Sequence, residues 1–417
     1  MKCLIIGNGA AGINAAAAIR EKNKHAGITI ISDEGIEVYG RPLISYYLSG
    51  KVSYEQIFYK GKDFYNEQKI HLDLNTHIAQ INLKEKIAVS TDGKTFPYDK
   101  LLLATGSVPF IAPTKNLTNQ KNVFTFLTFD QADKIKHAVK PNSKVVIVGG
   151  GLIGLKAAEA LHGKVGSITV VDLADRILAS ILDKSAANLI EKFISKKGIN
   201  FILGKSVGEV YGDENVQKVI LSDGQVLDCD ILIIAIGVRP NVELAKNAGL
   251  EVKRAIVVNE KMQTSDPDVY AAGDCVQTRE LLSNEEKILA IMPNATAQGQ
   301  TAGFNMAGED IALNPSTSMN AISFFGLQLI CAGLTGGQED NLFVDENEYK
   351  LRRLNIADDT LKGFVLINDI ARAGIYTDLI KNQTKLSELE YDLKQQDIGL
   401  NVYNKKERHD KLWEINQ

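Results

Sequence analysis

Apolar residues along the chain form short continuous runs and helix-spaced stretches, and one arrangement of the two occurs twice. Residues 2–19 read KCLIIGNGAAGINAAAAI, and residues 143–161 read SKVVIVGGGLIGLKAAEAL. Each stretch begins with an apolar run of strand length, passes through closely spaced glycines and ends in an alanine-rich helical segment. The pattern predicts a buried strand, a tight turn and a helix at both places.

A second pair of similar segments extends this duplication. Residues 90–109 read STDGKTFPYDKLLLATGSVP, and residues 221–240 read LSDGQVLDCDILIIAIGVRP. Each contains an Asp-Gly pair, which favours a hairpin turn, and then an apolar strand followed by a glycine and a proline. Two copies of one strand–helix–hairpin plan predict an α/β fold with two Rossmann-like dinucleotide-binding domains.

The second copy is expected to be inserted into the first. We place the first domain at residues 1–110 and 250–315, and the inserted domain at residues 111–249. The remaining residues, 316–417, contain strand-like runs at 320–333, 349–357 and 361–368, and a helix-like stretch from 369. This part predicts a small C-terminal α+β domain.

Composition and charge narrow the class of protein. The formal net charge is −4, whereas nucleic-acid binding needs a clustered basic face, so the charge gives no reason to expect a nucleic-acid partner. The apolar runs are too short to span a bilayer, and the N-terminus has the pattern of a strand, not of a signal peptide. The four cysteines are scattered without a CxxC pair, and the histidines lack metal-ligand spacing. We therefore expect a cytoplasmic protein with no nucleic-acid or membrane partner and no metal site.

The first glycine turn has the spacing of a dinucleotide-binding loop. Its glycines and the residues that open its helix are Gly7, Gly9, Ala10, Ala11 and Gly12. Such glycines allow a tight turn and close approach of a pyrophosphate, which then lies at the helix N-terminus. An acidic residue after the next strand should bind the adenosine ribose. Asp33 and Glu34 both stand there, and spacing does not choose between them.

The second glycine turn repeats this arrangement. Its residues are Gly149, Gly151, Leu152, Ile153 and Gly154. Asp172 follows the next apolar run, where its carboxylate could accept both ribose hydroxyls of NAD. Each unit of like charge on a 2′-phosphate at about 4 Å would cost roughly 4 kcal/mol at an effective dielectric constant of about 20. Asp172 therefore predicts NADH as the preferred cofactor, with Arg176 as the competing signal for NADPH.

A third motif, TSDPDVYAAGD at residues 264–274, completes a set that resembles a known family. In this order the three motifs are similar to those of the FAD-dependent pyridine nucleotide-disulfide oxidoreductases, over roughly the first 315 residues. The resemblance implies that FAD lies in the first domain and that Asp274, after Gly273, accepts a bond from a ribityl hydroxyl. It also implies that glycine-containing strand ends pass near bound dinucleotide, at Ala104, Thr105 and Gly106 for FAD and at Gly237 for NAD.

Residues 39–45, YGRPLIS, resemble most closely the branch of NADH:rubredoxin and ferredoxin reductases and of the flavin domain of nitrite reductase large subunits. There the region of Arg41 and Pro42 lies along FAD, with Arg41 as the expected pyrophosphate partner. Many relatives place a lysine and a glutamate beside the flavin where this chain has Tyr46 and Lys156. Lys156 could supply the missing ammonium and tune the flavin; the alternative is a plain surface lysine.

Related disulfide reductases carry a redox cysteine on the helix after this region, and LISYYLSGK at residues 43–51 has none. The resemblance then implies that NADH reduces FAD, and that the electrons leave singly to an iron–sulfur protein. This partner would be rubredoxin, ferredoxin or an iron–sulfur subunit of a larger complex. An NADH oxidase that uses dioxygen and a redox-sensing flavoprotein with little turnover stay open, as does the oligomeric state.

Overall fold

The computed structural model describes residues 1–117, 120–336, 342–393 and 398–414. Its residues group into two compact units. Unit 1 consists of Met1–Ala112, Thr125–Ala138 and Ile236–Ser316. Unit 2 contains the described residues of Pro113–Phe124, Val139–Ala235 and Thr317–Gln417.

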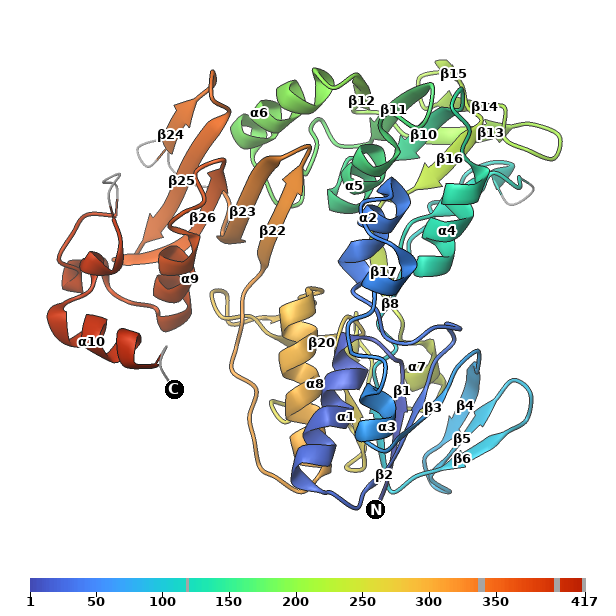
Figure 1. The fold of residues 1–417 in the computed structure, drawn as a ribbon, viewed down its shortest axis with the longest axis vertical. Helices are drawn as coiled ribbons and strands as arrows, with labels where there is room; N and C mark the ends of the chain where they lie inside the picture. Colours follow the sequence, from blue (N-terminus) through green and yellow to red (C-terminus); the bar gives the residue numbers. More distant parts are fainter. Residues whose placement is uncertain (118–119, 337–341, 394–397, 415–417) are drawn as a thin grey trace. The chain divides into compact units, whose positions relative to one another are not determined.

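A five-stranded parallel sheet forms the centre of unit 1 (Figure 1), in the order β19-β7-β1-β2-β3. Its strands are β1 (Lys2–Ile6), β2 (Gly27–Ile31), β3 (Ile70–Asp73), β7 (Lys100–Leu103) and β19 (Val269–Ala271). Helices α1 (Ala10–Lys22) and α8 (Met292–Met306) pack side by side. A Cβ atom on Gly299 would lie 2.2 Å from the carbonyl oxygen of Ala11, so this contact requires glycine.

Smaller elements complete unit 1. The strands are β4 (Ile78–Asn82), β5 (Ile87–Ser90), β6 (Thr95–Pro97), β8 (Ser107–Pro109), β17 (Val238–Pro240), β18 (Ile256–Val257), β20 (Val276–Arg279) and β21 (Glu286–Lys287). The helices are η1 (Arg41–Leu43), α2 (Ile44–Ser49), η2 (Tyr54–Gln56), α3 (Phe64–Glu67), α4 (Phe129–Ala138) and α7 (Glu243–Asn247). Strands β8 and β17 pair with each other in an antiparallel ribbon.

Unit 2 contains a second sheet of the same kind, in the order β12-β11-β10-β16-β9. Its strands are β9 (Val123–Thr125), β10 (Lys144–Val148), β11 (Ser167–Asp172), β12 (Ile199–Leu203) and β16 (Ile231–Ile234). Helix α5 (Leu152–Leu161) follows β10, and α6 (Lys184–Ser195) connects β11 to β12. An antiparallel sheet of β13 (Val207–Tyr211), β14 (Lys218–Leu221) and β15 (Val226–Asp228) accompanies it.

The duplication seen in the sequence is repeated in the backbone. The β5–β6 and β14–β15 hairpins turn at Gly93 (φ +84°) and Gly224 (φ +87°), a region that favours glycine. In both glycine loops the first glycine donates its N–H to the end of the neighbouring strand, Gly7 to Ile31 and Gly149 to Val171, each at 2.8 Å. The two loops are therefore held in the same way.

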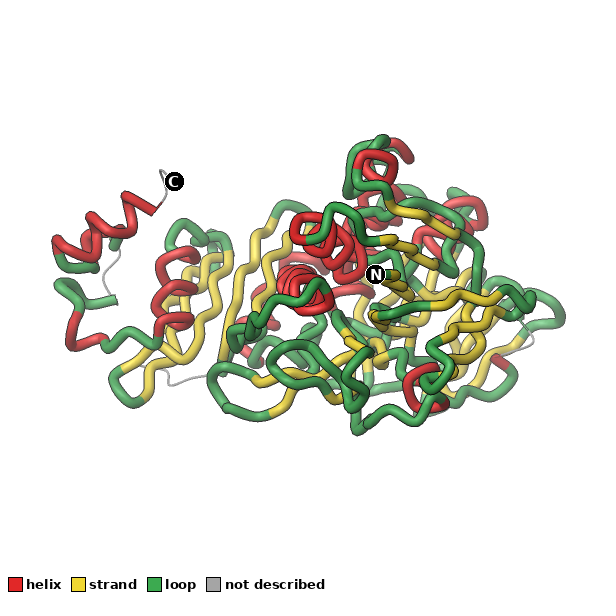
Figure 2. The backbone as a smooth tube through the Cα atoms, turned by 90° about the horizontal axis from the view of Figure 1, so that it is seen from below, coloured by secondary structure: helices red, strands yellow, loops and turns green. Residues whose placement is uncertain are grey.

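The C-terminal part of unit 2 is built on an antiparallel sheet, in the order β22-β23-β26-β25-β24. These strands are β22 (Met319–Phe324), β23 (Leu327–Gly333), β24 (Leu342–Asp345), β25 (Lys350–Ala357) and β26 (Thr360–Ile367). Helix α9 (Ala373–Asn382) packs beside β26 (Figure 2), where Tyr376 and Phe364 are fully buried against each other. Two short turns, η5 (Leu386–Glu388) and η6 (Leu400–Val402), and helix α10 (Lys405–Glu414) follow.

The predicted fold class is confirmed: two Rossmann-like sheets and a C-terminal α+β part are present. The compact units divide the chain at positions that differ from the predicted domain limits. Residues 125–138 and 236–249, which we placed in the inserted domain, group with unit 1. The domain limits themselves stay a prediction.

Candidate cofactor-binding site

The first glycine loop joins β1 to α1 and combines two glycines that the fold requires with one that it does not. Gly7 has φ +116°, and a Cβ atom there would lie 2.1 Å from the carbonyl oxygen of Ala104. A Cβ atom on Gly12 would lie 2.0 Å from the oxygen of Gly7. Gly9 differs, because a Cβ atom there would meet nothing within 4 Å.

The N-terminus of α1 faces this open space without a cap. Gly9 is the N-cap residue, no side-chain cap accepts a hydrogen bond from the first-turn N–H groups, and the first turn contains no acidic residue. The free N–H groups and the helix dipole therefore favour an anion at this position. The loop can thus bind a phosphate group.

The two acidic candidates after β2 have different surroundings. Asp33 is 65% exposed, and Nδ1 of His77 lies 3.2 Å from its carboxylate. Glu34 is 27% exposed and accepts hydrogen bonds from Tyr39 Oη (2.7 Å) and from Arg41 Nη2 (3.1 Å). Glu34 is therefore the candidate that lies beside the other predicted cofactor residues.

Arg41 and Asp274 lie within electrostatic range of each other, although they are far apart in sequence. Burial would lower the pKa of the Arg41 guanidinium. The nearby Tyr39, Glu34 and Asp274 outweigh burial and leave this pKa raised. Arg41 also donates to the carbonyl oxygen of Leu127 at 3.1 Å, and Pro42 follows it in η1.

Asp274 follows a strand end whose backbone is fixed by neighbouring side chains. Gly273 has φ +92°, and its N–H donates to Oε1 of Gln298 at 2.8 Å. Ser107, at the start of β8, donates its hydroxyl to Oδ2 of Asp274 at 3.0 Å. Ser107 was not among the predicted site residues, and its position directly after Ala104-Thr105-Gly106 is the signal that could have identified it.

The residues that end β7 lead directly into the β8–β17 ribbon. Thr105 donates its hydroxyl to the carbonyl oxygen of Asn241 at 2.7 Å. Gly106 has φ +65° with open space beside it. Gly237, which we assigned to the NAD site, groups with unit 1, and its carbonyl accepts a bond from the N–H of Phe110 at 2.9 Å.

The second glycine loop, in unit 2, has the same division of roles. A Cβ atom on Gly154 would lie 1.9 Å from the oxygen of Gly149, which itself has φ +113°. A Cβ atom on Gly151 would meet nothing within 4 Å. Gly151 caps α5 without a side-chain bond, and Leu152 and Ile153 form the first turn. This helix N-terminus can also bind a phosphate group.

Asp172 ends β11 beside this loop and is held there by two backbone N–H groups. Its Oδ2 accepts from Gly150 at 2.5 Å, and its Oδ1 accepts from Ala174 at 2.7 Å. Arg176 is turned away from it: Nε donates to the carbonyl oxygen of Leu182 at 3.1 Å, and Nη1 donates to Asp175 at 2.8 Å. Arg176, which the sequence offered as a possible partner for the 2′-phosphate of NADPH, is thus bonded within its own loop.

Lys156 lies in α5 and is mostly buried, with 13% of its side chain exposed. Its ammonium pairs with the carboxylate of Glu159 and donates to the carbonyl oxygen of Ser323 at 3.3 Å. The same carboxylate accepts the N–H of Phe325 at 2.9 Å. Within unit 2, Lys156 therefore links the second glycine-loop helix to the β22–β23 turn.

The four cysteines are unpaired and buried. Burial raises the pKa of the Cys3 and Cys331 thiols to about 11 and that of Cys229 to about 12. Burial also raises the pKa of Cys275, beside Asp274, and its thiol contacts the carbonyl oxygen of Ala272. Reactivity needs an accessible thiolate, so these four behave as inert side chains.

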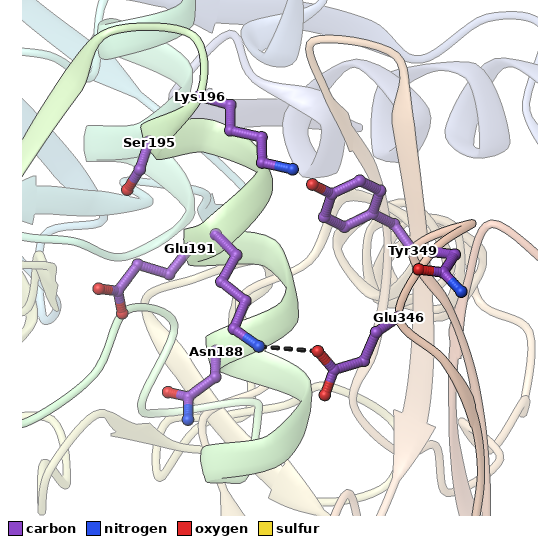
Figure 3. Close-up of a pocket in the computed structure, with 8 residues that line it drawn as sticks. Asn188, Glu191, Ser195, Lys196, Glu346 and Tyr349 are labelled. Carbon is purple, nitrogen blue, oxygen red and sulfur yellow. Dashed lines mark hydrogen bonds and ion pairs between the residues drawn. The ribbon is translucent and has the colours of Figure 1, made fainter.

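Unit 2 has a polar groove whose lining includes none of the predicted site residues (Figure 3). It has a volume of about 630 Å³ and is lined by α6 and by the turn between β24 and β25. An ion pair between Lys192 and Glu346, at 2.8 Å, crosses it. Its lysines and glutamates balance, so it has no charge preference for an anionic dinucleotide.

Among the residues that the structure describes, no group of histidine, cysteine or acidic side chains is placed to hold a metal ion. No helix in the described part of the chain is long and apolar enough to cross a membrane.

The paired nucleotide loops, each in its own parallel sheet, define a two-dinucleotide oxidoreductase. A family model described as pyridine nucleotide-disulphide oxidoreductase matches residues 1–299. This chain belongs to that family and is an NAD(P)H-dependent FAD oxidoreductase.

The proteins similar to this chain include an NADH oxidase and a rubredoxin reductase. An NADH oxidase from Methanocaldococcus jannaschii is 37% identical over 345 residues, which cover 80% of this chain and 76% of the relative. A rubredoxin-NAD(+) reductase from Pseudomonas putida is 32% identical over 314 residues, which cover 74% of this chain and 80% of the relative. A covalent putidaredoxin reductase–putidaredoxin complex is similar in structure, with a TM-score of 0.86, 26% identity and coverage of 92% and 94%.

The described residues of unit 1 fit a bound FAD. The α1 N-terminus has no side-chain cap, and a Cβ atom on Gly9 would meet nothing within 4 Å. The side-chain amide nitrogen of Asn8, between Gly7 and Gly9, is buried and lacks a hydrogen-bond partner. Arg41 supplies a cation and Asp274 an acceptor, and the charge of Asp274 helps to raise the pKa of Arg41. The donors and acceptors that a dinucleotide needs are thus present.

Proposed function

We propose that this protein is an NADH:acceptor oxidoreductase that passes electrons from NADH through FAD to an iron–sulfur protein. The observation that carries the proposal is the pair of uncapped glycine loops, one in each unit, each followed by a carboxylate at a strand end. FAD, when bound, supplies the chemistry: it accepts a hydride and can release electrons singly. The protein's own residues bind and orient the cofactors.

In unit 1 the proposed FAD contacts surround the first loop. The N–H groups of the α1 N-terminus, at Gly9, Ala10 and Ala11, together with Arg41, would bind the pyrophosphate. Glu34 would accept the ribose hydroxyls, and Asp274 would accept a ribityl hydroxyl. Gly7, Gly12, Thr105, Gly106 and Gly273 would allow the backbone to approach the cofactor.

In unit 2 the proposed NADH contacts are Gly151, the first turn of α5 and Asp172. Because Asp172 is held by two N–H groups, its carboxylate would keep one orientation toward the adenosine ribose. A 2′-phosphate would meet that charge, and Arg176 is engaged elsewhere. These contacts support NADH over NADPH.

The proposed acceptor follows from the thiols and from the relatives. A disulfide relay needs an accessible thiolate, and the four cysteines are buried with raised pKa values. The rubredoxin reductase relative and the putidaredoxin reductase complex support an iron–sulfur partner. Unpaired thiols also fit the reducing conditions of the cytoplasm, where we expect the reaction.

A second candidate function is an NADH oxidase that reduces dioxygen. It is favoured by the M. jannaschii relative, which is 37% identical to this chain. Both functions share the same reduction of FAD by NADH and differ only in what reoxidises the flavin.

The test of the shared step is reconstitution followed by anaerobic reduction. The purified chain, incubated with FAD and desalted, should retain one FAD per chain. Mixed anaerobically with equal concentrations of NADH or NADPH, the flavin absorbance should bleach faster with NADH. Retention of FMN in place of FAD, or faster bleaching with NADPH, would contradict the proposal.

The role of Lys156 as an electrostatic group for the flavin stays a prediction. Its pairing with Glu159 reduces the net charge that it could project. The flavin midpoint potential of Lys156→Met, compared with that of Glu159→Gln, tests this role. If the midpoint potential is unchanged in both variants, the Lys156–Glu159 pair does not tune the flavin and only joins α5 to β22.

A further inference from the structure

Tyr39 contacts two of the residues proposed to bind FAD: Glu34, at the adenosine ribose, and Arg41, at the pyrophosphate. Its hydroxyl donates to Oε2 of Glu34 at 2.7 Å, while Arg41 donates to Oε1 of the same carboxylate at 3.1 Å. The Arg41 guanidinium also lies over the Tyr39 ring, 5.7 Å from its centre. Both groups that FAD would use are thus in contact with one tyrosine.

Tyr39 is itself fixed from several sides. Its hydroxyl accepts the N–H of Phe129 at 3.0 Å, at the start of α4. The backbone on either side is bonded to a neighbouring segment, Gly40 N–H to Ile57 at 2.8 Å and Tyr59 N–H to Val38 at 2.9 Å. Burial raises the pKa of the Tyr39 phenol, so it stays a neutral donor at working pH. The hydroxyl therefore has one defined direction, toward Glu34.

Binding of FAD would change the partners of Arg41 and Glu34 unequally. Arg41 would have to turn toward the pyrophosphate, and its bond to Glu34 would be exchanged for that contact. A carboxylate has about four acceptor positions, so Glu34 can accept ribose hydroxyls while it keeps the Tyr39 bond. Tyr39 is then the side chain that holds Glu34 in the direction of the ribose.

We infer that Tyr39 is a positioning residue for the adenosine half of FAD, acting through Glu34. The inference rests on the proposed FAD site in unit 1. A positioning role for Tyr39 predicts a result that a purely structural role would not. FMN lacks the adenosine half, so loss of the Tyr39 hydroxyl should weaken FAD binding and leave the weaker binding of FMN unchanged.

The test uses Tyr39→Phe, which removes the hydroxyl and keeps the ring. The dissociation constants of FAD and FMN are measured by flavin fluorescence on the full-length apoprotein. The constant for FAD should rise about tenfold, as expected for a lost bond to a charged group, and that for FMN should not change. In a Glu34→Ala background, Tyr39→Phe should have no further effect on FAD.

Tyr47→Phe is the matched control. Tyr47 also donates to a carboxylate, Asp133 Oδ1 at 2.6 Å, and its ring also packs against Phe129, with centroids 4.9 Å apart. Neither Tyr47 nor Asp133 is a proposed FAD contact, so this variant should bind FAD as the wild type does.

Three results would overturn the inference. They are an equal loss of FAD and FMN affinity, an effect of Tyr39→Phe that persists without Glu34, and a Tyr39→Phe protein that does not fold while Tyr47→Phe does. Wild-type protein that binds no FAD would instead overturn the proposed function. The two failures are therefore distinguishable.

Discussion

At the scale of single residues, Asp33 and Glu34 are adjacent carboxylates with different environments. Glu34 is 27% exposed and is bonded to Tyr39 and Arg41, whereas Asp33 is 65% exposed and faces His77. We expect Glu34→Ala to weaken FAD binding by about 1.5–3 kcal/mol, the usual loss for a bond to a charged group. Asp33→Ala should change it by less than about 0.5 kcal/mol.

The measurement is flavin retention by the two variants after dialysis, followed by titration with FAD. Because the variants remove the same charge from neighbouring positions, a change in net charge affects both equally. A larger loss in Asp33→Ala would show that the adenosine ribose lies on the other side of the loop.

Asp172 is the residue on which the choice of nicotinamide cofactor depends. Its carboxylate is held by Gly150 and Ala174, so it cannot easily turn away from a 2′-phosphate. Asp172→Ala should raise KM for NADH several-fold and lower KM for NADPH, so that the two values approach each other.

Arg176→Ala is the control, because Arg176 bonds to Leu182 and Asp175 within its own loop. This variant should leave the ratio of kcat/KM for the two cofactors within a factor of about two of the wild type. A collapse of NADPH use in Arg176→Ala would show that the arginine reaches the phosphate after all.

At the scale of elements, the same glycine loop contains positions with opposite tolerance. A Cβ atom on Gly154 would overlap the oxygen of Gly149 at 1.9 Å, whereas Gly151 faces open space with ordinary extended backbone angles. Gly154→Ala should therefore lower the free energy of unfolding by about 1–3 kcal/mol or more.

Gly151→Ala should change stability by no more than about 1 kcal/mol, since its main effect on the fold is at a helix N-cap. Its methyl group would occupy the space over the α5 N-terminus, so KM for NADH should rise at least about tenfold. Denaturant unfolding and steady-state kinetics on the two variants separate these effects. Equal loss of stability in both would contradict the division of roles within the loop.

At the scale of the whole molecule, the parts of the fold with local signals could be predicted from the sequence. The glycine loops and the Asp-Gly hairpins each depend on a few neighbouring residues, and all of them appear where the pattern placed them. The assignment of residues 236–249 to a unit could not be predicted, because it depends on tertiary contacts such as the β8–β17 pairing.

The candidate site shows the same limit. Glycine spacing led to the prediction of Gly9 and Gly151 as cofactor contacts, and an acid at a strand end led to that of Asp172. The contacts of Ser107 with Asp274 and of Tyr39 with Phe129 could not be predicted, because they join residues far apart in the sequence. Likewise, the partner of Lys156 in β22 could not be read from α5 alone.

The central claim is that electrons leave the flavin singly to an iron–sulfur protein. The most direct measurement is stopped-flow reoxidation of the NADH-reduced enzyme by rubredoxin, ferredoxin, dioxygen and a disulfide in parallel. We predict that an iron–sulfur protein reoxidises the flavin fastest and that added salt slows this reaction, as for a small charge-steered interface. Faster reoxidation by dioxygen would contradict the claim and make the protein an NADH oxidase, and faster reoxidation by the disulfide would require one of the four buried thiols to become accessible.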